Sequence, residues 1–276
     1  MLVLTAAILH ASWNAMAKSG GLPEYSIASY QLVGALICAL LIGFVPFPTA
    51  QAWPYILLSV FIHNLYYFSL ARCYRSGDLS LVYPLFRGLA PVLVAIGAGW
   101  FAGEWLSRPA LVGVFLVSFG LIVLVVMGGA QGRPSKNMVK WGLITSVFIS
   151  IYTVVDGLGV RTVDNSLSYI LWLFALEFLP ICGWLYWTQW AKWRDYMRAN
   201  KGKIIAGGVA SSLAYALVIY AMSLGAMALV SSLRETSVIF ATIIGALWLK
   251  EPFGRQRITA ASFVVLGVMV IKYYGQ

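Results

Sequence analysis

Ten runs of apolar residues, separated by short polar breaks, limit how this chain can fold more than any other feature. Each run is about 17–23 residues long, the length that a helix rising 1.5 Å per residue needs to cross about 30 Å of hydrocarbon. The pattern therefore predicts an all-α integral membrane protein with ten transmembrane helices. The runs fall at 2–18, 26–46, 54–73, 80–102, 109–128, 138–157, 167–188, 204–223, 228–249 and 257–274.

The composition agrees with a membrane environment. Hydrophobic residues make up 61% of the chain and charged residues only 10%, against about 25% charged residues in soluble domains. The net charge of +10 does not favour nucleic-acid binding, because most basic residues lie in short loops, where they anchor the protein beside anionic headgroups and fix its topology. The longest polar gap, Gln189–Lys203, holds five basic residues and is interpreted as a solvated loop.

Two further features restrict the class of protein. The first run lacks a basic leader and is interrupted by His10, Trp13 and Asn14, so we interpret it as a retained helix and not as a cleaved signal peptide. The chain has three scattered cysteines and two histidines. This set argues against a disulfide framework and against a zinc or haem centre, so we expect no metal and no cofactor.

The second half of the chain repeats the first. The fourth and ninth runs begin with the same pattern, and an upstream tyrosine and a downstream glutamate also match. The matched positions are Tyr67 and Tyr215, Gly77 and Gly225, Leu81–Val82 and Leu229–Val230, Leu85 and Leu233, Arg87 and Arg234, and Gly103–Glu104 and Lys250–Glu251, the arginine and glutamate pairs after a one-residue slip.

This repeat predicts two five-helix units, residues 1–132 and 133–276. An odd number of spans in each unit forces the second copy to enter the membrane from the opposite side. The result is an inverted-topology repeat, the architecture that many secondary transporters use for alternating access.

The glycine-to-arginine pattern that opens the fourth and ninth runs, their closing glutamates and the five-plus-five layout resemble the drug/metabolite transporter superfamily, and within it the ten-helix EamA type. The resemblance implies a central cavity lined by helices 1, 3, 4, 6, 8 and 9, and transport of small metabolites such as amino acids or other organic ions. The segment from His10 to Asn14, followed by Lys18, is similar to a subgroup associated with phosphonate use. The chain departs from many relatives in carrying Gln31 where they have a basic residue in helix 2.

The orientation of the chain in the membrane is open. Loops 1, 3, 5, 7 and 9 share one side of the predicted bundle and hold 14 Lys and Arg residues, whereas the opposite side holds three, Arg108, Arg161 and Lys272. The positive-inside rule therefore predicts that both termini lie outside the cytoplasm. The resemblance implies cytoplasmic termini, so the two indications disagree.

Polar and ionisable residues inside the runs are the candidate substrate-binding residues. A charged side chain at the bilayer centre costs about 2.5–3.5 kcal/mol or more, so it usually faces a cavity or a partner. Aromatic, amide and charged residues recur at helical spacing in several runs, which favours a shared polar lumen, although an interhelical hydrogen bond explains any single one equally well. The candidates are His10, Trp13, Asn14, His63, Tyr67, Tyr83, Arg87, Tyr152, Asp156, Tyr215, Arg234 and Glu235.

Three charged candidates carry specific expectations. Arg87 shares one face with Tyr83 in a run that Pro84 and Pro91 are expected to kink, and it faces either substrate or a buried ion pair. Glu235 is expected to face inward, with Arg234 bracing it or another helix. Glu177, near the middle of the seventh run, is a further candidate for proton coupling.

The favoured function is secondary active transport, by alternating access, of a small polar or zwitterionic metabolite, such as an amino acid, carboxylate or phosphonate. Paired arginines suit a carboxylate or phosphonate because guanidinium binds those oxygens bidentately. No GxxxxGK[ST] motif occurs, so the energy is expected from protons or exchange. The expected partners are the substrate, the lipid of a cell (inner or plasma) membrane and protons, with no nucleic acid, for a monomer or homodimer. The alternative is an intramembrane lipid-modifying enzyme, which would need a tight catalytic set at one membrane face.

Overall fold

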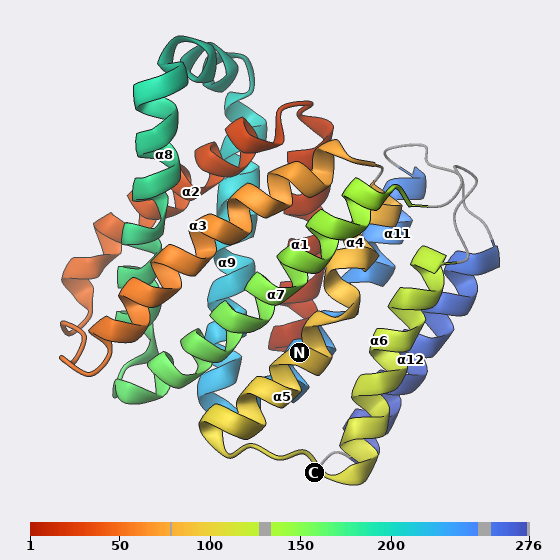
Figure 1. Cartoon of the computed structure of the whole chain (residues 1–276). Helices are drawn as coiled ribbons and strands as arrows, with labels where there is room; N and C mark the ends of the chain where they lie inside the picture. Colours follow the sequence, from red (N-terminus) through yellow and green to blue (C-terminus); the bar gives the residue numbers. More distant parts are fainter. Residues whose placement is uncertain (78, 127–133, 248–254, 275–276) are drawn as a thin grey trace.

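The computed structural model describes residues 1–77, 79–126, 134–247 and 255–274, and all regular structure within these ranges is helical (Figure 1). The elements of the first half are α1 (Leu2–Ser19), α2 (Pro23–Leu41), η1 (Ile42–Phe44), α3 (Trp53–Arg75), α4 (Leu79–Gly88), α5 (Ala90–Ala102) and α6 (Arg108–Val126). Those of the second half are α7 (Lys136–Gly159), η2 (Val160–Thr162), α8 (Ser166–Ala199), α9 (Lys201–Leu224), α10 (Met227–Arg234), α11 (Ser237–Leu247) and α12 (Arg255–Tyr274).

Among the residues that the structure describes, six helical segments are long and apolar enough to cross a membrane, and two shorter apolar helices accompany them. The six segments are Pro23–Phe44, Trp53–Arg75, Leu81–Ala102, Lys136–Thr162, Ser166–Ala199 and Lys201–Leu224, and the shorter ones are Arg108–Val123 and Thr259–Tyr274. Large apolar side chains such as Leu40, Trp100 and Phe101 are at least 75% exposed, as a surface that faces lipid requires. The chain is thus an all-helical, multi-pass membrane protein. The count of ten crossings stays a prediction.

The fourth and ninth runs are each broken into two helices. α4 ends at Gly88 and α5 begins at Ala90, because Pro91 has no N–H to donate to the carbonyl of Arg87. Pro84, expected to contribute a kink, lies inside the continuous α4. In the ninth run α10 ends at Arg234 and α11 begins at Ser237, although this segment contains no proline.

The polar gap Gln189–Lys203 is helical, so its interpretation as a loop was wrong. α8 continues to Ala199 after a kink at Gln189 (φ −144°, ψ 26°), and α9 begins at Lys201. The extension is amphipathic: Trp193 is only 3% exposed, and its Nε1–H donates to Ser29 Oγ of α2 at 2.9 Å. Packing of this aromatic face stabilises the helix, while its basic residues point outward.

Helices pack in matched pairs. α1 packs on α9 and α11, and α7 packs on α3 and α5. In the predicted repeat α7 is the counterpart of α1, α3 of α9, and α5 of α11, so the two sets of contacts correspond. α6 and α12 lie side by side along one edge of the bundle, and α2 packs on α8 (Figure 1). The predicted boundary between residues 132 and 133, and the match at Lys250–Glu251, lie outside the described residues.

Candidate functional site

Aromatic rings from three helices meet in the centre of the bundle. The imidazole of His63 on α3 stacks on the Tyr152 ring of α7 with 4.1 Å between centroids. Tyr215 of α9 lies edge-on to both rings, at 5.3 Å from each. Tyr66 of α3 contacts Tyr152 from another side at 5.2 Å. The cluster therefore joins helices that are far apart in sequence.

A small cavity of about 20 Å³ lies among these rings. That space holds about one water molecule. Six predicted site residues line it, namely His10, Trp13, His63, Tyr67, Tyr152 and Tyr215. Six other residues also line it, namely Gln31, Tyr66, Phe174, Glu177, Ser211 and Ser212. The structure thus brings half of the predicted residues to the lining of one small cavity.

The other lining residues differ in how far the sequence points to them. Glu177 was a candidate for proton coupling but not for substrate binding, and Ser211–Ser212, which were not candidates, occupy the repeat position of His63–Asn64. Tyr66 and Phe174 carry no signal, because aromatic residues are frequent in every run and only packing decides which of them faces the centre.

Asp156 does not line the cavity but anchors a residue that does. Its two carboxylate oxygens accept hydrogen bonds from the hydroxyls of Tyr169, at 2.8 Å, and Tyr215, at 2.6 Å. Ser59 also interacts with Asp156, and its Oγ lies 3.0 Å from Nδ1 of His63. A continuous buried network thus connects His63, through Ser59, to Asp156 and the two tyrosines.

An ion pair joins the two broken helices. Arg87 Nε of α4 donates to Glu235 Oε2 at 2.8 Å, and the two side chains are 4% and 0% exposed. The Tyr83 hydroxyl donates to Ser237 Oγ at 2.9 Å beside this pair. The breaks in the fourth and ninth runs therefore face each other across the bundle, and Arg87, not Arg234, holds Glu235.

Arg234 is a buried cation without a hydrogen-bonding partner in the described part of the chain. Its residue exposure is 0%, and none of its three guanidinium nitrogens makes a hydrogen bond there. Its charge acts on His10, Tyr152 and Asp156, although it is not among the residues that line the small cavity. A buried guanidinium with unused donors is costly, and it is the least satisfied group of the described interior.

Asn14 faces α3 and is not among the residues that line the cavity. Its side-chain oxygen accepts a hydrogen bond from the Tyr74 hydroxyl, and its nitrogen donates to the carbonyl of His10 at 2.6 Å. Trp13 Nε1 donates to Nδ1 of His10 at 3.1 Å. The polar face predicted for α1 is therefore divided between the cavity and a contact with α3.

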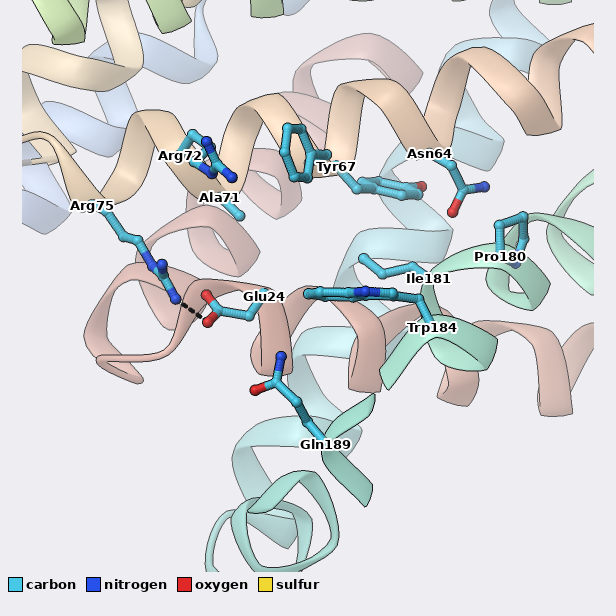
Figure 2. Close-up of a pocket in the computed structure, with 11 residues that line it drawn as sticks. Glu24, Asn64, Tyr67, Ala71, Arg72, Arg75, Pro180, Ile181, Trp184 and Gln189 are labelled. Carbon is cyan, nitrogen blue, oxygen red and sulfur yellow. Dashed lines mark hydrogen bonds and ion pairs between the residues drawn. The ribbon is translucent and has the colours of Figure 1, made fainter. Parts of the chain in front are cut away.

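A larger pocket of about 350 Å³ lies between α2, α3 and α8 (Figure 2). We call it the vestibule. Tyr67 lines both the vestibule and the central cavity, so the two spaces are neighbours. The residues that line the vestibule are Glu24, Asn64, Tyr67, Phe68, Ala71, Arg72, Arg75, Pro180, Ile181, Trp184 and Gln189.

The long apolar helices define a multi-pass α-helical membrane protein, with buried charged and aromatic side chains in its interior. No group of three His, Cys, Asp or Glu side chains suited to a metal ion occurs within the ranges that the structure covers. The sequence profile of the EamA-like transporter family matches residues 136–273. The chain therefore belongs to the EamA-like transporter family, which confirms the resemblance to the drug/metabolite transporter superfamily.

A solved structure supports the fold. A crystal structure of a protein that is 16% identical in sequence superposes with a TM-score of 0.74, covering 99% of this chain and 96% of that chain. At this identity the likeness concerns the fold alone. No curated protein matches the sequence.

Proposed function

We propose that this protein is a secondary active transporter of a small zwitterionic or anionic metabolite in the cell membrane. In this proposal, residues 1–132 and 133–276 form two inverted repeats that rock around the central cavity. The family assignment favours transport over the intramembrane-enzyme alternative.

The buried, unpartnered guanidinium of Arg234 is the observation that carries the proposal. The carboxylate of Glu235 is bound by Arg87 through Oε2, and no described group accepts a hydrogen bond from the guanidinium of Arg234, which keeps its full set of donors. A carboxylate or phosphonate of the substrate would supply the missing acceptor oxygens with the planar geometry that guanidinium prefers. Binding would thereby offset the cost of burying this cation.

The opposite end of a zwitterion has matching groups in the cavity. Glu177 lines it, is 3% exposed, and leaves Oε2 without a hydrogen-bond partner among the described residues. The faces of Tyr66, Tyr152 and Tyr215 attract a cation through the ring quadrupole. An ammonium group is therefore the complement of this side of the site.

Alternating access is supported by the size of the cavity and by the broken helices. A space of about 20 Å³ is too small for an amino acid, so substrate can enter only when helices move apart. The breaks after Gly88 and Arg234 lie where the two predicted repeats meet, which is where discontinuous helices commonly form transporter sites.

Proton coupling is supported by the network around Asp156. This carboxylate is fully buried and bonded to two tyrosines, and it connects through Ser59 to His63. Substitution of Asp156 by Asn keeps the size of the side chain but removes its ability to release a proton. We expect Asp156→Asn to abolish pH-gradient-driven uptake while exchange of substrate between the two sides continues.

The test begins with a thermal-shift screen of the purified protein against amino acids, aminoalkylphosphonates and organic cations, since a ligand stabilises by RT ln(1 + [L]/Kd). Uptake of the best ligand is then measured in proteoliposomes. We expect a zwitterion or anion to stabilise the protein and Arg87→Ala and Arg234→Gln to abolish its uptake. Arg234→Lys should retain part of the uptake, and Arg108→Gln, at the start of α6, should retain all of it. Stabilisation by organic cations alone, or normal flux in Arg234→Gln, would contradict the proposal.

A further inference from the structure

The vestibule is much larger than the central cavity and has no part in the site proposed there. Its volume of about 350 Å³ falls within the range of about 300–1,000 Å³ that small-molecule sites occupy. It reaches the surface of the protein, because Phe68 and Trp184 on its wall are 49% and 47% exposed. It lies between the start of α2, the C-terminal half of α3 and the middle of α8.

The charges on the vestibule wall favour an anion. Arg75 forms an ion pair with Glu24, as the dashed line in Figure 2 marks. Arg72 has no acidic partner among the described residues; its guanidinium instead lies over the rings of Phe68, at 4.4 Å, and Trp141, at 5.2 Å. Two arginines and one glutamate leave one uncompensated positive charge beside the pocket.

Two acceptor atoms of lining residues, at opposite ends of the pocket, have no partner in the described structure. They are Oδ1 of Asn64 and Oε2 of Glu24, both buried. The amide nitrogen of Asn64 is already used, because it donates to the carbonyls of Val60 and Glu177 at 2.8 and 2.9 Å. Each of these two oxygens can therefore accept a hydrogen bond from a bound donor, such as an ammonium group.

Apolar surface completes the pocket. Figure 2 shows Tyr67 reaching into it from α3, and Ile181 and Trp184 from α8. Such surfaces bind an aromatic or branched apolar group through buried area and ring contacts. A lipid acyl chain would fit this surface but would leave the acceptor oxygens of Asn64 and Glu24 unpaired, so a soluble zwitterion is the better complement.

We propose that the vestibule is a second binding site, which takes a small zwitterion with an apolar side group before it reaches the central cavity. The anionic group binds Arg72, the ammonium group binds Oε2 of Glu24, and the apolar group contacts Trp184. Tyr67 separates the two sites, because it lines both spaces and interacts with Glu177 in the central one. Passage onward rests on the proposed transport function, whereas binding in the vestibule does not.

Thiol protection tests this site in the full chain. The native cysteines Cys38, Cys73 and Cys182, all buried, are replaced by alanine, and Ile181→Cys is introduced into the pocket wall. The protein is placed in phosphatidylcholine nanodiscs, and modification by a sulfonatoethyl thiosulfonate reagent is timed. The probes share one ring: L-phenylalanine as the zwitterion, phenylacetate as the anion and phenethylamine as the cation.

We expect L-phenylalanine to slow the modification saturably, phenylacetate to protect less and phenethylamine least. Arg72→Gln should raise the concentration for half-protection at least tenfold, and Trp184→Leu should raise it several-fold. Arg108→Gln, at the start of α6, should change it less than twofold. Equal protection in the Arg72→Gln and parent proteins would overturn the site, and so would protection by phosphatidylglycerol without any probe.

This design distinguishes a refutation of the vestibule site from a refutation of the transport proposal. Arg234→Gln is expected to abolish uptake but to leave L-phenylalanine protection of the Cys at position 181 unchanged. Protection that disappears together with uptake in this variant would mean a single continuous site and would refute the vestibule. Protection without uptake of any screened ligand by the unmodified protein would refute only the transport proposal.

Discussion

The buried ion pair between Arg87 and Glu235 offers a quantitative test of how the two broken helices are held together. Its side chains are 4% and 0% exposed, with 2.8 Å between Nε and Oε2. Removing one member of such a pair leaves a buried charge without compensation and typically costs about 3–5 kcal/mol. Replacing both members by apolar residues of similar size is often neutral.

The two single substitutions should differ. Arg87→Met leaves Glu235 beside Arg234, whose donors are free, so a new contact between these neighbours would limit the loss to about 3 kcal/mol. Glu235→Leu leaves two buried arginines with no carboxylate between them, so we expect a loss nearer to 5 kcal/mol. The double variant should lie within about 1–2 kcal/mol of the unmodified protein.

The free energy of unfolding is measured by titration from mild detergent into sodium dodecyl sulfate, followed by tryptophan fluorescence, for all four proteins of the cycle. The coupling energy between the two positions should exceed about 3 kcal/mol. Single losses that simply add in the double variant, with a coupling energy below about 0.5 kcal/mol, would refute the pairing. Uptake is expected to be lost in all three variants and serves only to report function.

Two further predictions concern packing and the anchoring of Tyr215. Gly207→Ala should lower the free energy of unfolding by about 1–3 kcal/mol, because a Cβ there would overlap the Tyr30 ring. Gly202→Ala in the same helix, with open space around it, should raise it by about 0.5–1 kcal/mol. The same titration measures both variants, and equal effects would contradict the close packing of α2 on α9. Tyr215→Phe should cost about 1.5–3 kcal/mol, because it removes the 2.6 Å hydrogen bond to the buried Asp156, and an unchanged free energy of unfolding would contradict that bond.

The breaks in the fourth and ninth runs show which helix breaks can be predicted from local sequence and which cannot. The break before Pro91 follows from a missing backbone donor, which any reader of the sequence can locate. Pro84 carries the same local signal but sits inside an unbroken α4. The break after Arg234 has no proline; it is accompanied by local hydrogen bonds of Glu235 and Thr236 to carbonyls three residues earlier and by the contact of Ser237 with Tyr83.

In the extension of α8, tertiary packing overrides what the local sequence predicts. The five basic residues of the gap Gln189–Lys203 predicted a solvated loop, because a high density of charge is typical of chain exposed to water. Trp193 and Tyr196 make the segment helical instead, through hydrogen bonds and packing against Ser29, Ser26 and Tyr25 of α2. These partners lie more than 160 residues away, so no local window contains them.

The sequence by itself determined the membrane class, the family and the identity of the charged groups in the interior. An apolar run of sufficient length has one stable solution in lipid, and a charged residue within it needs a partner wherever it lies. The partner itself depends on which helices touch. Only the tertiary structure decided that Arg87 binds Glu235, that Asp156 anchors Tyr215 and that Arg234 keeps its donors free, because ion pairs and hydrogen bonds require contact within about 3 Å, and contacts of that kind join residues 59 to 148 positions apart.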